Sequence, residues 1–229
     1  MKQSRRFIDN LDKVDRNKEY GLDEAASLLI DCNKTKFDES IELAINLGID
    51  PKHADQIVRG TVALPNGIGK DIRILVFAKD NLAEEAKRAG ADYVGAEDMV
   101  EKVKGGWTDV DVVIAAPNMM AEVGKLGKIL GPRGLMPNPK VGTVTADIAK
   151  AVGESKAGKI EFRVDKNGII HNSIGKLSFE KDKIIENARV FINAILRAKP
   201  QAAKGTYMKK VTITSTMGPG IKLDKSRIS

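Results

Sequence analysis

The apolar residues of this chain follow two different strand patterns, and one pattern lies between two stretches of the other. From Ile41 to Ile49 apolar residues recur at every second position, which is typical of a strand with one buried face. The same alternation returns in residues 160–164. Residues 71–80 and 110–117 instead hold nearly continuous apolar runs, as in parallel strands that are covered on both faces. The sequence therefore predicts two domains of different type.

The expected helices support this division. Helical spacing predicts amphipathic helices over residues 22–30 and 178–199, with Ser178 as the N-cap of the second. Two more helices are expected at residues 81–91 and 145–158, each near a continuous apolar strand, and this alternation indicates a parallel α/β layer. Further strands are expected at residues 57–64, 168–175 and 209–214.

Two glycine-bearing segments mark where the chain crosses between the predicted domains. The first contains Gly67 and Gly69, and the second contains Gly158. Regular elements end at such segments, and domain insertion is tolerated there. We expect a discontinuous two-layer α+β domain, residues 1–67 and 160–229, with an inserted three-layer Rossmann-like α/β domain, residues 68–159. The three glycines are candidate hinge residues.

The positive charge of the chain is concentrated at one end. The whole chain carries +7, of which residues 1–67 contribute −2, residues 68–159 contribute +1 and residues 160–229 contribute +8. A basic segment on an otherwise balanced chain suggests a polyanionic partner, most often a nucleic acid. A solvated basic face is the alternative.

Common catalytic and metal-binding motifs are missing from the sequence. Residues 124–128 (GKLGK) lack the spacing and the hydroxyl of a Walker loop, and no G-x-G-x-x-G follows a continuous apolar strand. His53, His171 and Cys32 are the only histidines and cysteine, so no zinc spacing exists. We expect no catalysis, no cofactor and no metal. An enzyme that binds a nucleotide at the strand ends of the inserted domain is the alternative.

The apolar runs and the start of the chain bear on its location. No run approaches the length of a membrane span, and the first residues lack the apolar core of a secretory signal. A single cysteine also suits a reducing compartment. We therefore expect a cytoplasmic protein that does not contact membranes.

Residues 34–40 suggest contact with nucleic acid. Phe37 follows Lys34 and Lys36, and Ser40 stands at the start of the half-buried strand. Lysines can bind phosphates while an aromatic ring stacks on a base or a ribose. The alternative is that Phe37 belongs to the core at the start of this strand.

Residues 212–220 suggest a second contact. The strand ends in alternating threonines, and the last of them, Thr216, is followed by Met217 and Gly218. Hydroxyl groups on one strand face can bond to RNA, and a glycine lets the backbone approach a ligand closely. A solvated β-branched face that ends in a turn would give the same pattern.

A third segment, residues 131–140 (GPRGLMPNPK), is too rich in proline and glycine for a helix or a strand. It carries Arg133, Met136 and Lys140. Long rigid loops with apolar and basic side chains contact another domain or a ligand, or they dock as structural loops.

Four stretches in order resemble the bacterial ribosomal protein L-one family, over essentially the full length of the chain. They are KFDES from Lys36, NLGIDPKHADQIVRGTVALPNG from Asn46, KILGPRGLMPNPKVGTVT from Lys128 and TITSTMGPG from Thr212. The resemblance implies a stalk protein of the large ribosomal subunit, near the tRNA exit site, that binds large-subunit ribosomal RNA through the discontinuous domain. It also implies help in releasing deacylated exit-site tRNA, and repression of translation by binding its own messenger RNA. We expect a monomer when the protein is free of the ribosome.

The resemblance also implies which residues contact RNA. Position by position, these are Lys36, Phe37, Ser40, His171, Thr216, Met217 and Gly218. Ser40 stands where relatives often carry threonine, which keeps the hydroxyl. The loop with Arg133, Met136 and Lys140 is a candidate for contact with the other domain or with tRNA. A basic protein that binds RNA without specificity is the remaining alternative.

Overall fold

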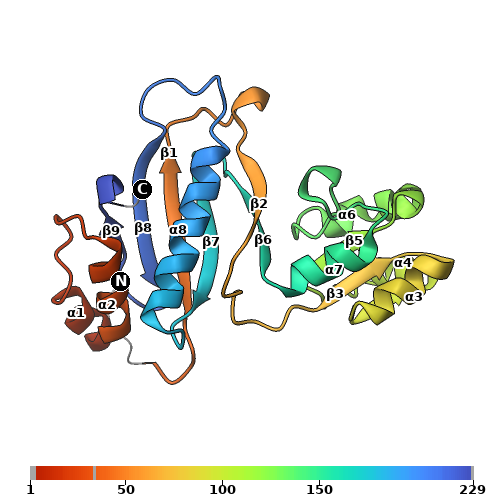
Figure 1. Cartoon of the computed structure of the whole chain (residues 1–229), viewed down its shortest axis with the longest axis horizontal. Coiled ribbons are helices and arrows are strands. Elements are labelled where there is room, and N and C mark those ends of the chain that lie inside the picture. Colours follow the sequence, from red (N-terminus) through yellow and green to blue (C-terminus); the bar gives the residue numbers. More distant parts are fainter. Residues whose placement is uncertain (1–3, 33–34, 228–229) are drawn as a thin grey trace. The chain divides into compact units, whose positions relative to one another are not determined.

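The computed structural model describes residues 4–32 and 35–227, and the chain divides into two compact units (Figure 1). The first unit combines Met1–Gly69 with Ile160–Ser229, and the second is Lys70–Lys159. Each unit has its own cluster of buried apolar side chains. The sequence places the crossings at 67/68 and 159/160, and in the structure they fall at 69/70 and 159/160.

The first unit is built on an antiparallel sheet in the order β7-β1-β8-β9. Helices α2 and α8 pack on each other and against this sheet. The elements are β1 (Ser40–Leu47), β7 (Ile169–Lys176), β8 (Met208–Ser215), β9 (Ile221–Leu223), α2 (Leu22–Asp31) and α8 (Lys181–Arg197). The predicted two-layer α+β architecture is confirmed.

The side chains of β1 show how the sheet is oriented. Ile41, Leu43, Ile45 and Leu47 are buried under the helices, whereas Glu42 lies between them and is exposed. Burial of the alternate apolar residues is worth roughly 1.5–3 kcal/mol per large side chain. We call the sheet face opposite α2 and α8 the outer face.

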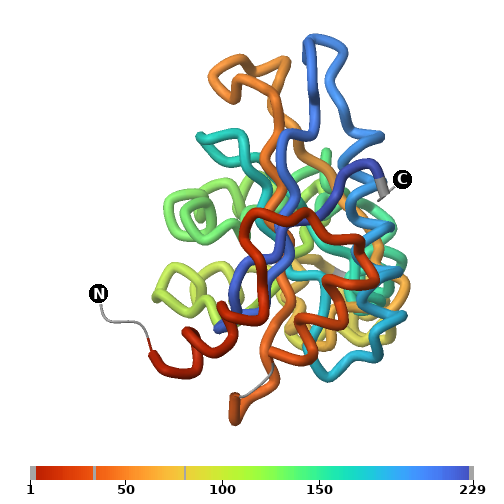
Figure 2. The backbone as a smooth tube through the Cα atoms, turned by 90° about the vertical axis from the view of Figure 1, so that its left-hand side faces the viewer, coloured from red at the N-terminus to blue at the C-terminus, as the bar shows by residue number. Residues whose placement is uncertain are grey.

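Three shorter elements complete the first unit. They are α1 (Arg5–Leu11) and the strands β2 (Arg59–Ala63) and β6 (Lys159–Arg163), which pair with each other. The N-terminal segment runs beside the C-terminal strand β9, as Figure 2 shows. Tyr20 joins them, because its N–H donates to the Lys222 carbonyl at 2.9 Å and its carbonyl accepts from Asp224 N–H at 2.9 Å.

The second unit contains a parallel sheet in the order β4-β3-β5. Its central strand β3 is buried along its whole length. Because connections between parallel strands are right-handed as a rule, we expect α3 and α4 on opposite faces of this sheet. Helix α3 packs with α7, and α4 packs with α5. This confirms the predicted three-layer inserted fold. The elements are β3 (Ile74–Phe77), α3 (Asp80–Arg88), β4 (Tyr93–Gly95), α4 (Glu97–Lys104), β5 (Val112–Ala115), α5 (Met120–Val123), α6 (Gly127–Leu130) and α7 (Ile148–Lys156).

The structure corrects some of the expected elements. Ser178 is not the N-cap of α8, because Glu180 precedes the helix and Ser178 bonds instead to Asp38, through its hydroxyl at 2.8 Å and its N–H at 3.1 Å. Helix α7 begins three residues after Thr145, with the Asp147 carboxylate accepting from Lys150 N–H at 3.1 Å. Helices α1, α4, α5 and α6 and strands β4 and β9 were not predicted, since each is too short to give a clear period.

Candidate nucleic-acid interface

The structure brings together two segments that are far apart in the sequence: residues 35–40 and the turn at residues 215–218. Strands β1 and β8 pair antiparallel with Ile41 opposite Ser215, so the chain entering β1 lies beside the chain leaving β8. Thr216 N–H donates to the Ser40 carbonyl at 3.0 Å, across 176 residues of sequence. Six of the seven predicted contact residues are therefore neighbours at one end of the sheet.

The Thr216 hydroxyl is engaged within the protein. It accepts from Ser40 N–H at 3.0 Å and lies 3.3 Å from the Ser40 carbonyl, to which it can donate. A hydroxyl has one proton and two lone pairs, so one lone pair is left for a ligand. Thr216 therefore holds the two segments together as well as standing at the candidate interface.

Glu39 is a buried carboxylate at this end of the sheet, and sequence reasoning missed it. The residue is 2% exposed, and its Oε2 accepts from Met217 N–H at 2.8 Å. Burial raises the pKa of Glu39, but hydrogen bonds from Met217 N–H and from the Ser215 and Thr35 hydroxyls lower it, and the net pKa is below its usual value. A carboxylate within a stretch expected to bind RNA was the available signal. It would repel phosphates unless the protein itself satisfied it.

Two large apolar side chains are exposed beside these bonds. Phe37 is 54% exposed and Met217 is 46% exposed, and Lys36 is also exposed. The alternative that Phe37 belongs to the core is therefore wrong. Lys34 lies outside the described residues. An exposed aromatic ring, a thioether and an ammonium group together can stack on a base and neutralise a phosphate.

Strand β7 flanks Ser40 on the edge of β1 that faces away from β8. Lys176 lies opposite Ser40 in the register of β1 and β7, and its Nζ donates to Ser40 Oγ at 3.0 Å and to the Asp38 carbonyl at 3.4 Å. The Ser40 hydroxyl thus meets a cation. Sequence reasoning missed Lys176, because only strand pairing reveals that it faces residue 40.

His171 lies apart from the other predicted contacts. It is exposed on β7 opposite Ala44, which in turn lies opposite Thr212 of β8. Residues directly opposite in an antiparallel sheet share a face, so His171 and Thr212 both lie on the outer face. Its partner Ala44 is four residues after Ser40 on β1, so His171 extends the candidate interface across the sheet.

Gly218 serves the turn itself. Its N–H donates to the Ser215 carbonyl at 3.1 Å, and a Cβ at this position would collide with Ser215 Oγ. The absence of a side chain lets the turn close on Ser215. A glycine at position 218 is therefore explained by the turn itself as well as by the close approach of a ligand that the sequence suggested.

The proline-rich loop at residues 131–140 is docked within the second unit. Leu135 and Met136 pack against the core of that unit, and Arg133 Nη1 donates to Thr108 Oγ1. Lys140 is exposed. The docked structural alternative accounts for Met136, while the Arg133 and Lys140 side chains stay at the surface.

The candidate hinge glycines all have positive φ angles: 64° at Gly67, 71° at Gly69 and 98° at Gly158. Gly67 is held by the first unit, because Asn187 Nδ2 of α8 donates to its carbonyl at 2.9 Å. The preceding Asn66 N–H donates to Asn187 Oδ1 at 3.2 Å. The crossing segment is therefore anchored to α8 as far as Gly67.

The charges of the two units differ. The first unit carries +6 and the second carries +1, so the basic excess belongs to the unit with the candidate interface. Within residues 4–32 and 35–227, no group of three or more His, Cys, Asp and Glu side chains could hold a metal ion. No helix in these ranges is long and apolar enough to cross a membrane.

Comparison with known protein families agrees with this picture. The model of the ribosomal protein L1p/L10e family matches residues 29–219, which include both segments of the interface and the whole second unit. The family is one of large-subunit ribosomal proteins that bind ribosomal RNA. Because the match covers most of the sequence, the chain belongs to the ribosomal protein L1p/L10e family.

Proposed function

We propose that the chain binds the ribosomal RNA of the mobile stalk, near the tRNA exit site, through residues 35–40, the turn at 215–218 and the outer face of the first unit. One observation supports this above the others. Phe37 and Met217 are exposed on backbone that is fixed by Glu39 and Thr216, at one end of the more basic unit.

The chemistry of these residues suits a structured RNA with unstacked bases. Base stacking on an aromatic side chain contributes about 1–3 kcal/mol per base, and fixed backbone lowers the entropy that binding must overcome. Lys36 supplies a cation beside the ring, and the overall charge of +6 on this unit attracts phosphates before contact.

We also propose the finer roles that accompany this binding. The same surface binds a similar fold in the protein's own messenger RNA and thereby represses translation. A competition assay between stalk RNA and messenger RNA measures this, and simultaneous binding of both would contradict it. The second unit, with Arg133 and Lys140 at its surface, assists the release of deacylated tRNA.

The double variant Phe37→Ala/Met217→Ala tests the proposed RNA surface. We expect a loss of stalk RNA affinity of at least tenfold, because about 1–3 kcal/mol of stacking is removed per base. The melting temperature should hardly change, since both side chains are exposed. Binding is measured by titration with stalk RNA and with an unrelated duplex at several salt concentrations.

Leu196→Ala is the matched control, because Leu196 is 40% exposed but lies on α8, on the helical side of the sheet. It should leave the affinity unchanged. Equal affinity of the double variant and the control would remove this surface from the interface. Equal affinity of the natural chain for both RNAs would favour a nonspecific basic protein.

A shortened chain tests whether the first unit by itself supplies the affinity for stalk RNA. Gly69 is joined to Ile160 through a short glycine linker, which removes the second unit and keeps the segment that is anchored as far as Gly67. We expect it to fold, because the first unit has its own core, and to keep stalk RNA affinity within about tenfold, or ~1.4 kcal/mol. A hundredfold loss in a folded shortened chain would mean that the second unit supplies primary RNA contacts.

A further inference from the structure

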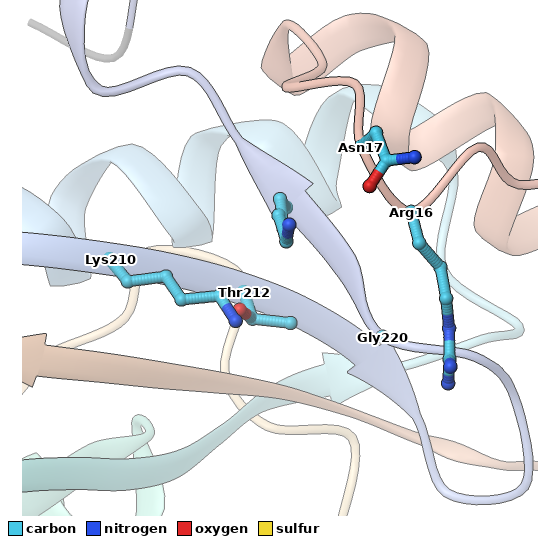
Figure 3. A pocket seen from close by; sticks show the side chains of 6 residues that line it. Arg16, Asn17, Lys210, Thr212 and Gly220 are labelled. Carbon is cyan, nitrogen blue, oxygen red and sulfur yellow. The ribbon is translucent and has the colours of Figure 1, made fainter.

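A hollow on the first unit is lined by three cations, none of which is among the seven predicted contact residues. Its volume is about 370 Å³, and its lining residues are Arg16, Asn17, Lys210, Thr212, Gly220 and Lys222. They come from three separate parts of the chain: the loop after α1, strand β8, and strand β9 with the turn before it. Figure 3 shows Lys210 extending along β8 toward Thr212, and Arg16 beside Gly220.

Strand pairing places this hollow on the outer face. Thr212 lies opposite Ala44 of β1 and opposite Lys222 of β9, and Ala44 lies opposite His171. His171, Ala44, Thr212 and Lys222 thus form one row across four strands. The hollow is therefore continuous with the candidate RNA surface and lies at its far edge.

In the described part of the chain, the cations of the hollow have no ion-pair partner. No ion pair joins Arg16, Lys210 or Lys222 to a carboxylate among residues 4–32 and 35–227. Asp15 and Glu19 belong to the same loop as Arg16, but they do not line the hollow. Three like charges around one hollow repel each other unless an anion lies between them.

The remaining lining groups also suit an anion. Within the described ranges no hydrogen bond engages the Thr212 hydroxyl, so it is available to donate to an oxygen. A side chain at Gly220 would press on Thr212 Cγ2 at 3.1 Å, so the glycine keeps this part of the hollow open. Hydroxyl, ammonium and guanidinium donors around an open hollow are the groups that bind phosphate oxygens.

We propose that this hollow binds backbone phosphate of the RNA that the first unit holds, so that the RNA extends from the turn at 215–218 across the outer face to the loop after α1. The proposal rests on the proposed RNA-binding function. The hollow contributes affinity without base preference, whereas Phe37 and Met217 contact bases. Arg16, which precedes the part of the chain matched by the family model, supplies one of the three cations.

The salt dependence of RNA binding tests the hollow. Arg16→Ala and Lys222→Ala are each titrated with stalk RNA at several salt concentrations, in the full chain. Each should reduce the slope of log affinity against log salt concentration by about 0.7–0.9, the value for one lost phosphate contact. Each should also weaken binding to an unrelated RNA by the same factor.

Arg197→Ala is the control for net charge, because Arg197 is exposed on α8, on the helical side of the sheet, and its loss changes the charge equally. It should leave the slope unchanged. If the hollow variants match the natural chain or the control, the hollow binds no phosphate. In that event a retained effect of Phe37→Ala/Met217→Ala would leave the proposed RNA function standing, whereas its absence would overturn both.

Discussion

Asn187→Leu should lower the free energy of unfolding of the first unit by about 3 kcal/mol, although leucine has nearly the same size. Asn187 is fully buried in α8, and its side chain serves three backbone groups. Nδ2 donates to the carbonyls of Ile174 at 2.8 Å and Gly67 at 2.9 Å, and Oδ1 accepts from Asn66 N–H at 3.2 Å. Leucine would leave all three without this partner, and each unpaired buried group costs about 1–3 kcal/mol.

The two units allow this effect to be measured with an internal reference. Trp107 is the only tryptophan and lies in the second unit, so its fluorescence follows that unit during urea unfolding. Far-UV circular dichroism follows the helices of both units, α8 among them. We expect Asn187→Leu to shift the circular dichroism transition and not the Trp107 transition. Asn193→Leu, an exposed position on the same helix, should change stability by less than about 0.5 kcal/mol. If the two variants are equally stable, the anchor to residues 66–67 is unimportant.

Glu39→Leu should lower stalk RNA affinity by about tenfold to a hundredfold, because charge-assisted hydrogen bonds contribute about 1.5–3 kcal/mol each. The substitution leaves Met217 N–H without its acceptor and releases the turn at 215–218. Glu39→Gln should restore part of the affinity, since its amide oxygen can still accept this bond. Affinity is measured by titration with stalk RNA at fixed salt, beside the melting temperature of each variant.

Glu42→Leu is a control that distinguishes the positioning role of Glu39 from the effect of removing a negative charge. Glu42 is exposed on β1, three residues after Glu39, and a carboxylate near RNA repels phosphates, so its removal should leave the affinity equal or higher. A purely electrostatic role predicts the same gain for Glu39→Leu, and such a gain would contradict the positioning role.

The pKa of Glu39 gives a second check. Because the folded protein lowers this pKa below 4.5, the ionised carboxylate stabilises the fold above pH ~4.5, and this contribution is lost as the pH falls through the lowered value. The difference in stability between the natural chain and Glu39→Gln should therefore be full at pH 5–8 and shrink in more acidic solution.

Local patterns in the sequence determined the elements and the division into units. Alternation from Ile41 to Ile49 fixed which residues of β1 face the helices, and continuous apolar runs marked the parallel sheet of the second unit. The segments KFDES and TSTMGPG also pointed to the candidate interface before any contact was known. Each of these features depends on residues within a few positions of each other, so a periodic pattern or a short motif reveals it.

The contacts within the interface were decided by the tertiary structure. Glu39 and Met217 are 178 residues apart, and they meet because β1 pairs with β8. The same pairing places Lys222 in the row with His171, and the chain before Tyr20 returns to β9 and brings Arg16 to Lys210 and Lys222. Ser178 has the sequence of a helix cap, yet Asp38 from the segment before β1 accepts its hydroxyl hydrogen bond. Strand order follows from burying the apolar faces of many elements at once, and this requirement leaves no periodic trace at any single position.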